Sequence, residues 1–454
     1  QGLEDDDAES PVAIFHPTYL VLTAGVADAF LSGDLFNLFV GFEVLLAASY
    51  VLITLGGSGE RVRAGTIYVV VSLLSSILFL TAIALVYAAT GTVNLAQLSQ
   101  RLAELDPGVQ LTLQVLLLVA FGIKAAIFPL SAWLPDSYPT APAPVTAVFA
   151  GLLTKVGVYA IIRTQTLLFP DGRLDDALMV AALATMLVGI LGAVAQNDIK
   201  RLVSFTLVSH IGFMLFGIAL SSEAGLGAAI FYVAHHITVQ TALFLVVGLV
   251  ERRGGTTSLD GLGGLAKAAP LLAVLFFVPA MNLAGIPPFS GFLGKVGLFE
   301  AGIADSGALA YVLVAGGAVT SLLTLYALVK AWNKAFWQPV KVPGEPGGTA
   351  DAAAEAGPPR TVTAPPAVEP AAPVRLPGAM IGATAVLVSF GLGLAVVAGP
   401  LFGYTDRAAE LLRDRSQYVL AVLPDGSRGD GESAEVAETE GGTPEVTAVP
   451  TGQP

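Results

Sequence analysis

The sequence predicts an all-α polytopic membrane protein, and three observations support this class. First, 54% of the 454 residues are hydrophobic and only 13% are charged, which is too apolar for a soluble domain of this length. Second, apolar windows long enough to cross a bilayer recur along the chain. Third, proline interrupts two of these windows, which indicates the discontinuous helices of inverted-repeat transporters.

A bilayer-spanning helix needs about 20 apolar residues, and this requirement predicts about eleven spans. Lys and Arg residues concentrate in the loops after the second, sixth, eighth and tenth spans. By the positive-inside rule these loops are expected in the cytoplasm, and the C-terminal end is expected outside. The predicted spans are 17–31, 33–56, 65–90, 112–130, 145–168, 177–196, 202–221, 226–250, 269–303, 308–335 and 377–401.

These spans form two inverted five-helix repeats, and less apolar segments lie around them. A Pro-, Ala- and Gly-rich stretch is expected to be a flexible linker. Much of the net charge of −13 comes from acidic ends that are poor in aromatic residues, as in solvated tails. The expected segments are an acidic tail (1–16), the first repeat (17–168), the second repeat (177–335), the linker (342–375), a last membrane helix (377–401), a short interfacial helix (402–422) and a disordered acidic tail (423–454).

The composition also excludes several classes of function. The chain has no cysteine, so disulfides, thiolate-ligated metals and cysteine-ligated iron–sulfur clusters are excluded. It has no basic nucleic-acid surface, and the spacing of its histidines gives no metal-ligand set. It also lacks a Walker loop, a dinucleotide fingerprint and a nucleophile elbow. We therefore expect no cofactor, no metal and no nucleic-acid partner.

Three lysines lie near the middle of apolar spans, and a glutamate lies in an equally apolar run. They are Lys124, Lys155, Lys295 and Glu43. A charge at mid-bilayer costs about 2.5–3.5 kcal/mol on insertion scales, so such residues usually line a polar path. These four residues indicate charge movement through the membrane. For Lys155 the alternative is snorkelling to an interface, against which its central position argues.

Glu43 and Lys124 are expected to form a pair, with Lys155 reaching into the same cavity. Because each charge stabilises the ionised form of the other, movement of one partner would switch the protonation of the second. A proton could be loaded and released in this way. The alternative is structural, since a buried ion pair can simply anchor two helices.

Two adjacent histidines, His235 and His236, lie inside another apolar span. Histidine titrates near neutral pH and suits a proton relay. Neighbouring residues face different sides of a helix, so only one of the two is expected on a path. The alternative is a pair of hydrogen-bonded core histidines. For His210 the sequence favours packing over a relay.

The prolines that interrupt two spans lie close to lysines. Pro129 follows Lys124, and Pro287 and Pro288 precede Lys295. Proline removes a backbone donor and breaks a helix, and within a membrane the freed carbonyl groups must be satisfied by protein or water. We expect a helix break at each place, with a polar site beside it.

The segments around these residues resemble a known family. Gly33–Tyr50, Phe121–Pro129 and Ala284–Lys295 are similar to the antiporter-like membrane subunits shared by proton-pumping NADH:quinone oxidoreductase (complex I) and the Mrp-type multisubunit cation/proton antiporters. The likeness covers residues of about 16–335. Gly33–Tyr50 and Ala284–Lys295 look most like the D-type subunits of the Mrp antiporters.

The resemblance implies a secondary transporter subunit that is not an enzyme. It implies exchange of protons for Na+ or another monovalent cation, partner subunits in a hetero-oligomeric complex, and a multi-pass location in the prokaryotic plasma membrane. In the roles it implies, Glu43 tunes Lys124, Lys155 bridges, His235 or His236 serves the central relay, and Lys295 is the terminal lysine.

Two alternatives and two departures accompany the resemblance. The chain could instead be a proton-pumping subunit of complex I, or a structural membrane subunit with no conducting path. Many relatives have a lysine where this chain has the neutral Gln240. Relatives also usually have further helices before the one that precedes Glu43, so the chain is expected to lack a leading bundle.

Overall fold

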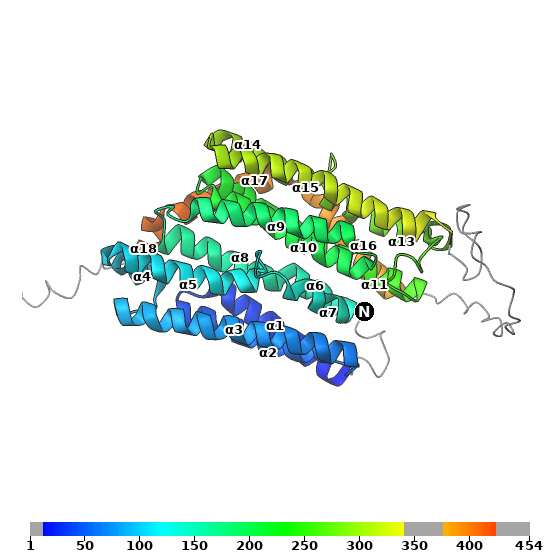
Figure 1. Cartoon of the computed structure of the whole chain (residues 1–454), viewed down its shortest axis with the longest axis horizontal. Helices are drawn as coiled ribbons and strands as arrows, with labels where there is room; N and C mark the ends of the chain where they lie inside the picture. Colours follow the sequence, from blue (N-terminus) through cyan, green and yellow to red (C-terminus); the bar gives the residue numbers. More distant parts are fainter. Residues whose placement is uncertain (1–11, 340–375, 424–454) are drawn as a thin grey trace, which may run out of the picture.

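The computed structural model describes residues 12–339 and 376–423. Within these ranges the chain is a bundle of helices that run roughly side by side (Figure 1). Ten of the described helical segments are long and apolar enough to cross a membrane. The only β-type pairings in the described ranges are two isolated bridges. The predicted all-α class is confirmed.

The first repeat runs from α1 to η4. Its elements are α1 (Val12–Leu31), α2 (Leu35–Thr54), α3 (Gly59–Thr90), α4 (Leu95–Arg101), η1 (Leu102–Glu104), α5 (Pro107–Ala125), α6 (Trp133–Ser137), η2 (Tyr138–Thr140), α7 (Ala143–Val148), η3 (Phe149–Leu153), α8 (Thr154–Arg163) and η4 (Thr164–Leu168).

The second repeat runs from α9 to η5, and three helices follow it. Its elements are α9 (Asp175–Ala195), α10 (Ile199–Ala219), α11 (Glu223–Gly254), α12 (Leu265–Ala268), α13 (Pro270–Ala284), α14 (Ser290–Asp305), α15 (Ala308–Trp332) and η5 (Asn333–Trp337). The last helices are α16 (Gly378–Val396), α17 (Ala398–Arg413) and α18 (Arg415–Val422).

Helices α3 and α11 show how closely the two repeats correspond. Both have 32 residues, begin after a capping serine and end at a glycine with left-handed backbone. After each of these helices the chain forms a β-bridge with the residue that caps the helix before it. After α3, Asn94 pairs with Asp34, the cap of α2; after α11, Ser258 pairs with Asp198, the cap of α10. Helix α4, which follows α3, lies at one end of the bundle, and α13, which comes after α11, lies at the opposite end (Figure 1). The two repeats are therefore inverted.

The two helix breaks are also built alike. The residue after α5 is Ala126 and the residue after α13 is Gly285, and both have positive φ, at 57° and 84°. The sequences that follow match position by position, from Ala125 to Leu134 (AAIFPLSAWL) and from Ala284 to Leu293 (AGIPPFSGFL). The step from α5 to α6 runs in the opposite direction to the step from α13 to α14 (Figure 1).

The prolines lie inside these breaks and not at the helix ends. Helix α5 ends at Ala125 and α13 ends at Ala284, whereas Pro129, Pro287 and Pro288 follow in the non-helical segments. The predicted span 112–130 therefore extends too far. The left-handed residue ends each helix first, because its backbone turns the chain out of the helical path.

Several predicted boundaries differ from the structure. Helix α1 begins at Val12, so residues 12–16 belong to the helix and not to a tail, because apolar residues continue the span across Pro17. Helix α4 was not expected. Residues 1–11, the linker 342–375 and residues 424–454 lie outside the described residues.

The predicted interfacial helix packs against the bundle as α17. The Phe402 ring stacks on the Phe231 ring of α11, with 3.9 Å between their centroids, and Thr405 and Ala409 are buried. After α17, hydrogen bonds from Ser416 and Gln417 hold the pKa of Asp414 below its ordinary value. Helix α17 therefore packs against one end of α11.

Candidate functional site

Glu43 and Lys124 are joined by a serine between them. Ser76 on α3 donates a hydrogen bond to the Glu43 carboxylate and accepts one from the Lys124 ammonium, with 3.1 Å between Nζ and Oγ. Lys124 Nζ also lies 3.4 Å from the Ser72 carbonyl oxygen. The sequence predicted the two ends of this bridge but not Ser76. A hydroxyl in this position can donate and accept at once, which is what passing a proton requires.

Lys124 is held in the last turn of α5, where the helix dipole favours a cation. The residue is 8% exposed, and its ammonium lies 5.6 Å from the centre of the Phe42 ring. A cavity of about 20 Å³ borders it, with Tyr68, Ser72 and Tyr138 in the wall. This volume exceeds the roughly 10–15 Å³ that one water molecule needs.

Lys155 follows a π-helical turn and folds back on it. Its Nζ donates to the Ala150 carbonyl oxygen at 2.6 Å and lies 3.3 Å from Thr154 Oγ1. Such turns are frequent at functional sites. The side chain borders a cavity of about 240 Å³ that is also lined by Tyr159 and Leu412. The expectation that it shares a cavity with Lys124 is not met: Lys124 borders the smaller cavity and Lys155 the larger one, since the Lys155 side chain turns back to the Ala150 carbonyl.

Three fully buried histidines meet at the centre of the bundle. The His236 ring lies 5.4 Å from the His210 ring, centre to centre, and His210 Nδ1 is 2.6 Å from the Tyr232 hydroxyl. His235 faces α14, where its Nδ1 lies 2.9 Å from Ser290 Oγ. Helical geometry thus turns the adjacent histidines towards different helices, as the sequence predicted.

Several nitrogens of this histidine cluster lack hydrogen-bond partners among the described residues. They are His210 Nε2, His235 Nε2 and both ring nitrogens of His236. Buried polar atoms are normally bonded, so such exceptions call for a physical reason. The Phe213 ring lies 5.6 Å from the His210 ring and 5.0 Å from the Lys295 ammonium, so the cluster lies near Lys295.

Lys295 lies at the second helix break, in α14. With Glu43, Lys124, Lys155, His235 and His236 it makes up the set of ionisable residues that we call the row. Lys295 is 3% exposed, and its Nζ donates to the carbonyl oxygens of Leu283 and Ala284 at 3.2 and 2.9 Å. The break after α13 leaves these carbonyls without helical partners. The ammonium also lies 5.0 Å from the centre of the Phe213 ring. Lys295 therefore satisfies the broken helix end.

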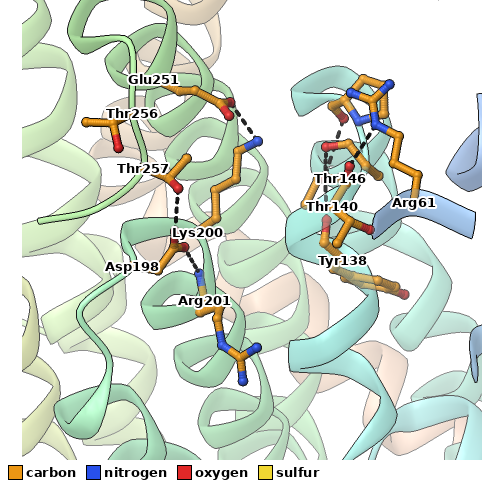
Figure 2. Close-up of polar contacts among 12 residues, drawn as sticks. Arg61, Tyr138, Thr140, Thr146, Asp198, Lys200, Arg201, Glu251, Thr256 and Thr257 are labelled. Carbon is orange, nitrogen blue, oxygen red and sulfur yellow. Dashed lines mark hydrogen bonds and ion pairs between the residues drawn. The ribbon is translucent and has the colours of Figure 1, made fainter. Parts of the chain in front are cut away.

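A charged cavity of about 630 Å³ lies at the end of the bundle where the start of α10 and the end of α11 face α3 and α6. We call it the vestibule. Lys200 Nζ pairs with Glu251 at 2.6 Å, and an Arg201 nitrogen pairs with Asp136 at 2.9 Å. Figure 2 shows Lys200 pointing to Glu251 on one wall and Arg61 reaching Thr140 on the other. By the loop charges, this end is the expected cytoplasmic side.

The sequence reasoning missed the polar side chains that connect the ionisable residues. Ser76 joins Glu43 to Lys124, and Ser290 and Asn282 attach His235 to the break between α13 and α14. The correspondence between the repeats could have drawn attention to them, because Ser72 and Ser76 occupy the places in α3 that His236 and Gln240 occupy in α11.

The model of the family described as "NADH:quinone oxidoreductase/Mrp antiporter, TM" matches residues 32–324. The broken helices and buried lysines thus define a class of membrane transport protein. The chain belongs to the NADH:quinone oxidoreductase/Mrp antiporter membrane family. It is a multi-pass membrane protein.

Within this family the chain is similar to the D-type subunits of bacterial Na+/H+ antiporters. It is 41% identical to the one from Alkalihalophilus pseudofirmus over 412 residues, which cover 90% of this chain and 78% of the relative. A chain of the Mrp complex from Dietzia sp. DQ12-45-1b matches with a TM-score of 0.80 and 40% identity, covering 90% of this chain and 79% of that one. A chain of respiratory complex I from Thermus thermophilus matches with a TM-score of 0.72 and 26% identity, covering 88% and 79%.

Proposed function

We propose that the chain is the proton-translocating membrane subunit of a multisubunit Na+/H+ antiporter. The observation that supports this proposal most directly is the hydrogen-bonded bridge from Glu43 through Ser76 to Lys124, which joins two members of the row. Identity of 41% with a D-type antiporter subunit, against 26% with a complex I chain, favours the antiporter over the complex I alternative. The proton path runs through Glu43, Lys124, Lys155, His235 or His236, and Lys295.

Protons move along this row by transfer between side chains, without a covalent intermediate. Separating Glu43 from Lys124 weakens the field that holds each in its ionised form. Lys124 then passes its proton along the path towards Lys295, and a proton that enters beside Lys124 replaces it. The subunit acts as a transporter and not as an enzyme.

The sodium route belongs to a partner subunit in this proposal. The path contains three lysines, and a bare cation beside an ammonium group in a region of low dielectric constant is strongly repelled. A proton avoids this repulsion because it travels as part of a titrating group. The names of the related proteins support partner subunits, since each is one subunit of an antiporter.

Protons enter from the vestibule in this proposal. Thr140 and Asp136 line the vestibule, and Tyr138, between them in sequence, lines the small cavity beside Lys124. The hydroxyls of Ser137 and Tyr138 are buried without a hydrogen-bond partner among the described residues. Polar groups at this point suit a water-assisted step from the vestibule to Lys124.

The decisive experiment replaces Lys124 or Glu43 with alanine in the assembled complex. Proton flux into membrane vesicles is measured on addition of sodium, potassium or lithium. We expect both variants to lose cation-dependent flux, because each removes one end of the bridge. The cation series identifies the exchanged ion.

Lys330→Ala is the matched control. Lys330 donates to the Val194 and Gln196 carbonyl oxygens at 2.8 and 2.6 Å and lies outside the row, so its loss should leave flux intact. Assembly is checked by recovery of the partner subunits. If Lys124→Ala assembles and transports normally, the row is only structural and the proposal is wrong.

A further inference from the structure

The end of α13 holds two members of the row through three consecutive residues. The carbonyl oxygens of Leu283 and Ala284 accept hydrogen bonds from Lys295 Nζ. The side chain of the preceding residue, Asn282, contacts Ser290 Oγ at 3.3 Å, and Ser290 Oγ contacts His235 Nδ1 at 2.9 Å. Lys295 and His235 are therefore positioned by the same helix end.

The directions of these hydrogen bonds can be worked out from one backbone group. The Gly291 N–H lies 2.9 Å from Asn282 Oδ1, and an N–H can only donate, so this atom is the amide oxygen. The Ser290 hydroxyl donates its single proton to Asn282 Oδ1, at 3.3 Å. With that proton used, Ser290 Oγ can only accept from His235. The proton of neutral His235 is therefore on Nδ1.

This assignment leaves His235 Nε2 as a bare acceptor. The atom is buried and has no hydrogen-bond partner among the described residues. Gly291 lies against this edge of the ring: a Cβ there would be 3.0 Å from Nε2 and 2.9 Å from Cε1. An unpaired buried acceptor costs roughly 1–3 kcal/mol, so packing alone does not account for it.

The first repeat lacks this arrangement. At the matching break, Ser131 stands in the place of Ser290, but Ile123 stands in the place of Asn282. The position in α3 that matches His235 is Val71. The Asn282 amide, which directs the Ser290 proton, therefore occurs in the same repeat as His235.

We propose that Asn282 and Ser290 are positioning residues that fix His235 as its Nδ1–H tautomer, so that Nε2 exchanges the proton with the Lys295 side of the path. This inference rests on the proposed proton path. When Nε2 takes a proton that comes from the Lys124 side, His235 becomes an imidazolium, still donating from Nδ1 to Ser290. Release from Nε2 towards Lys295 restores the starting tautomer.

The test measures the tautomer directly. Nitrogen-15 NMR of the assembled complex, labelled at histidine, distinguishes protonated from bare ring nitrogens, and the His235 signals are those lost in a His235→Gln variant. We expect Nδ1 protonated and Nε2 bare in the unmodified chain. Asn282→Leu frees the serine proton to turn to Nδ1, so we expect the tautomer to flip. Ser290→Thr keeps the hydroxyl and should keep the tautomer.

Proton flux measured on the same variants tests the consequence. We expect Asn282→Leu to lower flux by about 10-fold to 100-fold, as for groups that orient metal-binding histidines, and Ser290→Thr to retain it. Ser209→Ala is the control, because it removes a buried serine bond to the Met186 carbonyl oxygen away from His235.

Each outcome has one meaning. A bare Nδ1 in the unmodified chain, or no flip in Asn282→Leu, overturns the tautomer assignment. A flip with unchanged flux overturns the positioning role. Unchanged flux in His235→Gln itself removes His235 from the path, and so rejects that part of the proposed function while the measured tautomer still stands.

Discussion

The Lys124 ammonium reaches the Glu43 carboxylate through the Ser76 hydroxyl, which accepts from the first and donates to the second. A hydrogen bond to a charged group contributes roughly 1.5–3 kcal/mol, so the serine is a substantial part of the bridge. The neighbouring Ser75 donates to the Ala120 carbonyl oxygen at 2.9 Å. The two serines are adjacent and buried, but only Ser76 touches ionisable groups.

Ser76→Ala should therefore reduce cation-dependent proton flux, while Ser75→Ala should not. Loss of about 1.4 kcal/mol corresponds to a tenfold effect, so we expect a decrease of at least about tenfold. Flux into vesicles that contain equal amounts of assembled complex is the measurement. Equal flux in the two variants would mean that Glu43 and Lys124 communicate without the serine.

Tyr138→Phe tests the entry step beside Lys124. The Tyr138 hydroxyl is buried without a hydrogen-bond partner among the described residues, so removing it should not lower the stability of the complex. If the hydroxyl supports proton entry from the vestibule, Tyr138→Phe should lower proton flux. The temperature of thermal unfolding should stay the same or rise. Unchanged proton flux would mean that the Tyr138 hydroxyl takes no part in proton entry.

The paired breaks allow a prediction about stability. Gly285 has φ of 84°, and a Cβ there would be 2.9 Å from Lys295 Cδ. Gly285→Ala should cost about 1–2 kcal/mol for the left-handed backbone and displace Lys295, which lowers both melting temperature and flux.

Ala126→Gly is the counterpart change in the first repeat. It relieves the same backbone cost, but glycine loses more entropy on folding, by roughly 0.5–1 kcal/mol. We expect a small change in melting temperature and normal flux. A large loss of stability in Ala126→Gly would show that the Ala126 methyl group contributes packing beyond backbone conformation.

The covering role of α17 can be tested by labelling, because the chain has no cysteine of its own. Val158 lines the cavity beside Lys155, and Ala408 and Leu412 of α17 line it from the other side. A Val158→Cys chain should react slowly with a membrane-impermeant maleimide. Adding Phe402→Ala removes the ring that stacks on Phe231 and should accelerate labelling. An unchanged rate would mean that α17 does not control access to the cavity.

The sequence predicted the features that depend on local signals. Apolar length located the spans, and the charge of Lys124, Lys155 and Lys295 stood out because lysine is costly in a membrane. The polar bridges could not be predicted in the same way. Whether Ser76 or Ser75 faces Lys124 depends on the rotation of α3, and an almost uniformly apolar helix gives no pattern that sets this rotation.

Helix α4 and the precise helix ends were missed for a different reason. Helix α4 has only seven residues, too few for a hydrophobic period to be recognised. In each helix break the proline is easier to see in the sequence than the left-handed residue, Ala126 or Gly285, that ends the helix. The caps at Asp34 and Asp198 and the glycines after α3 and α11 were readable signals. Comparing the two halves of the chain would have revealed them.

The two lysines at the helix breaks belong to the same end of the bundle, although the backbones of the two repeats run in opposite directions. Lys124 precedes its break and Lys295 follows its own, while the two broken helices run in opposite directions (Figure 1). These two reversals cancel, so both lysines belong to half-helices, α5 and α14, on the same end of the bundle. The inversion that reverses the backbones of the two repeats therefore does not reverse the positions of their two break lysines along the bundle.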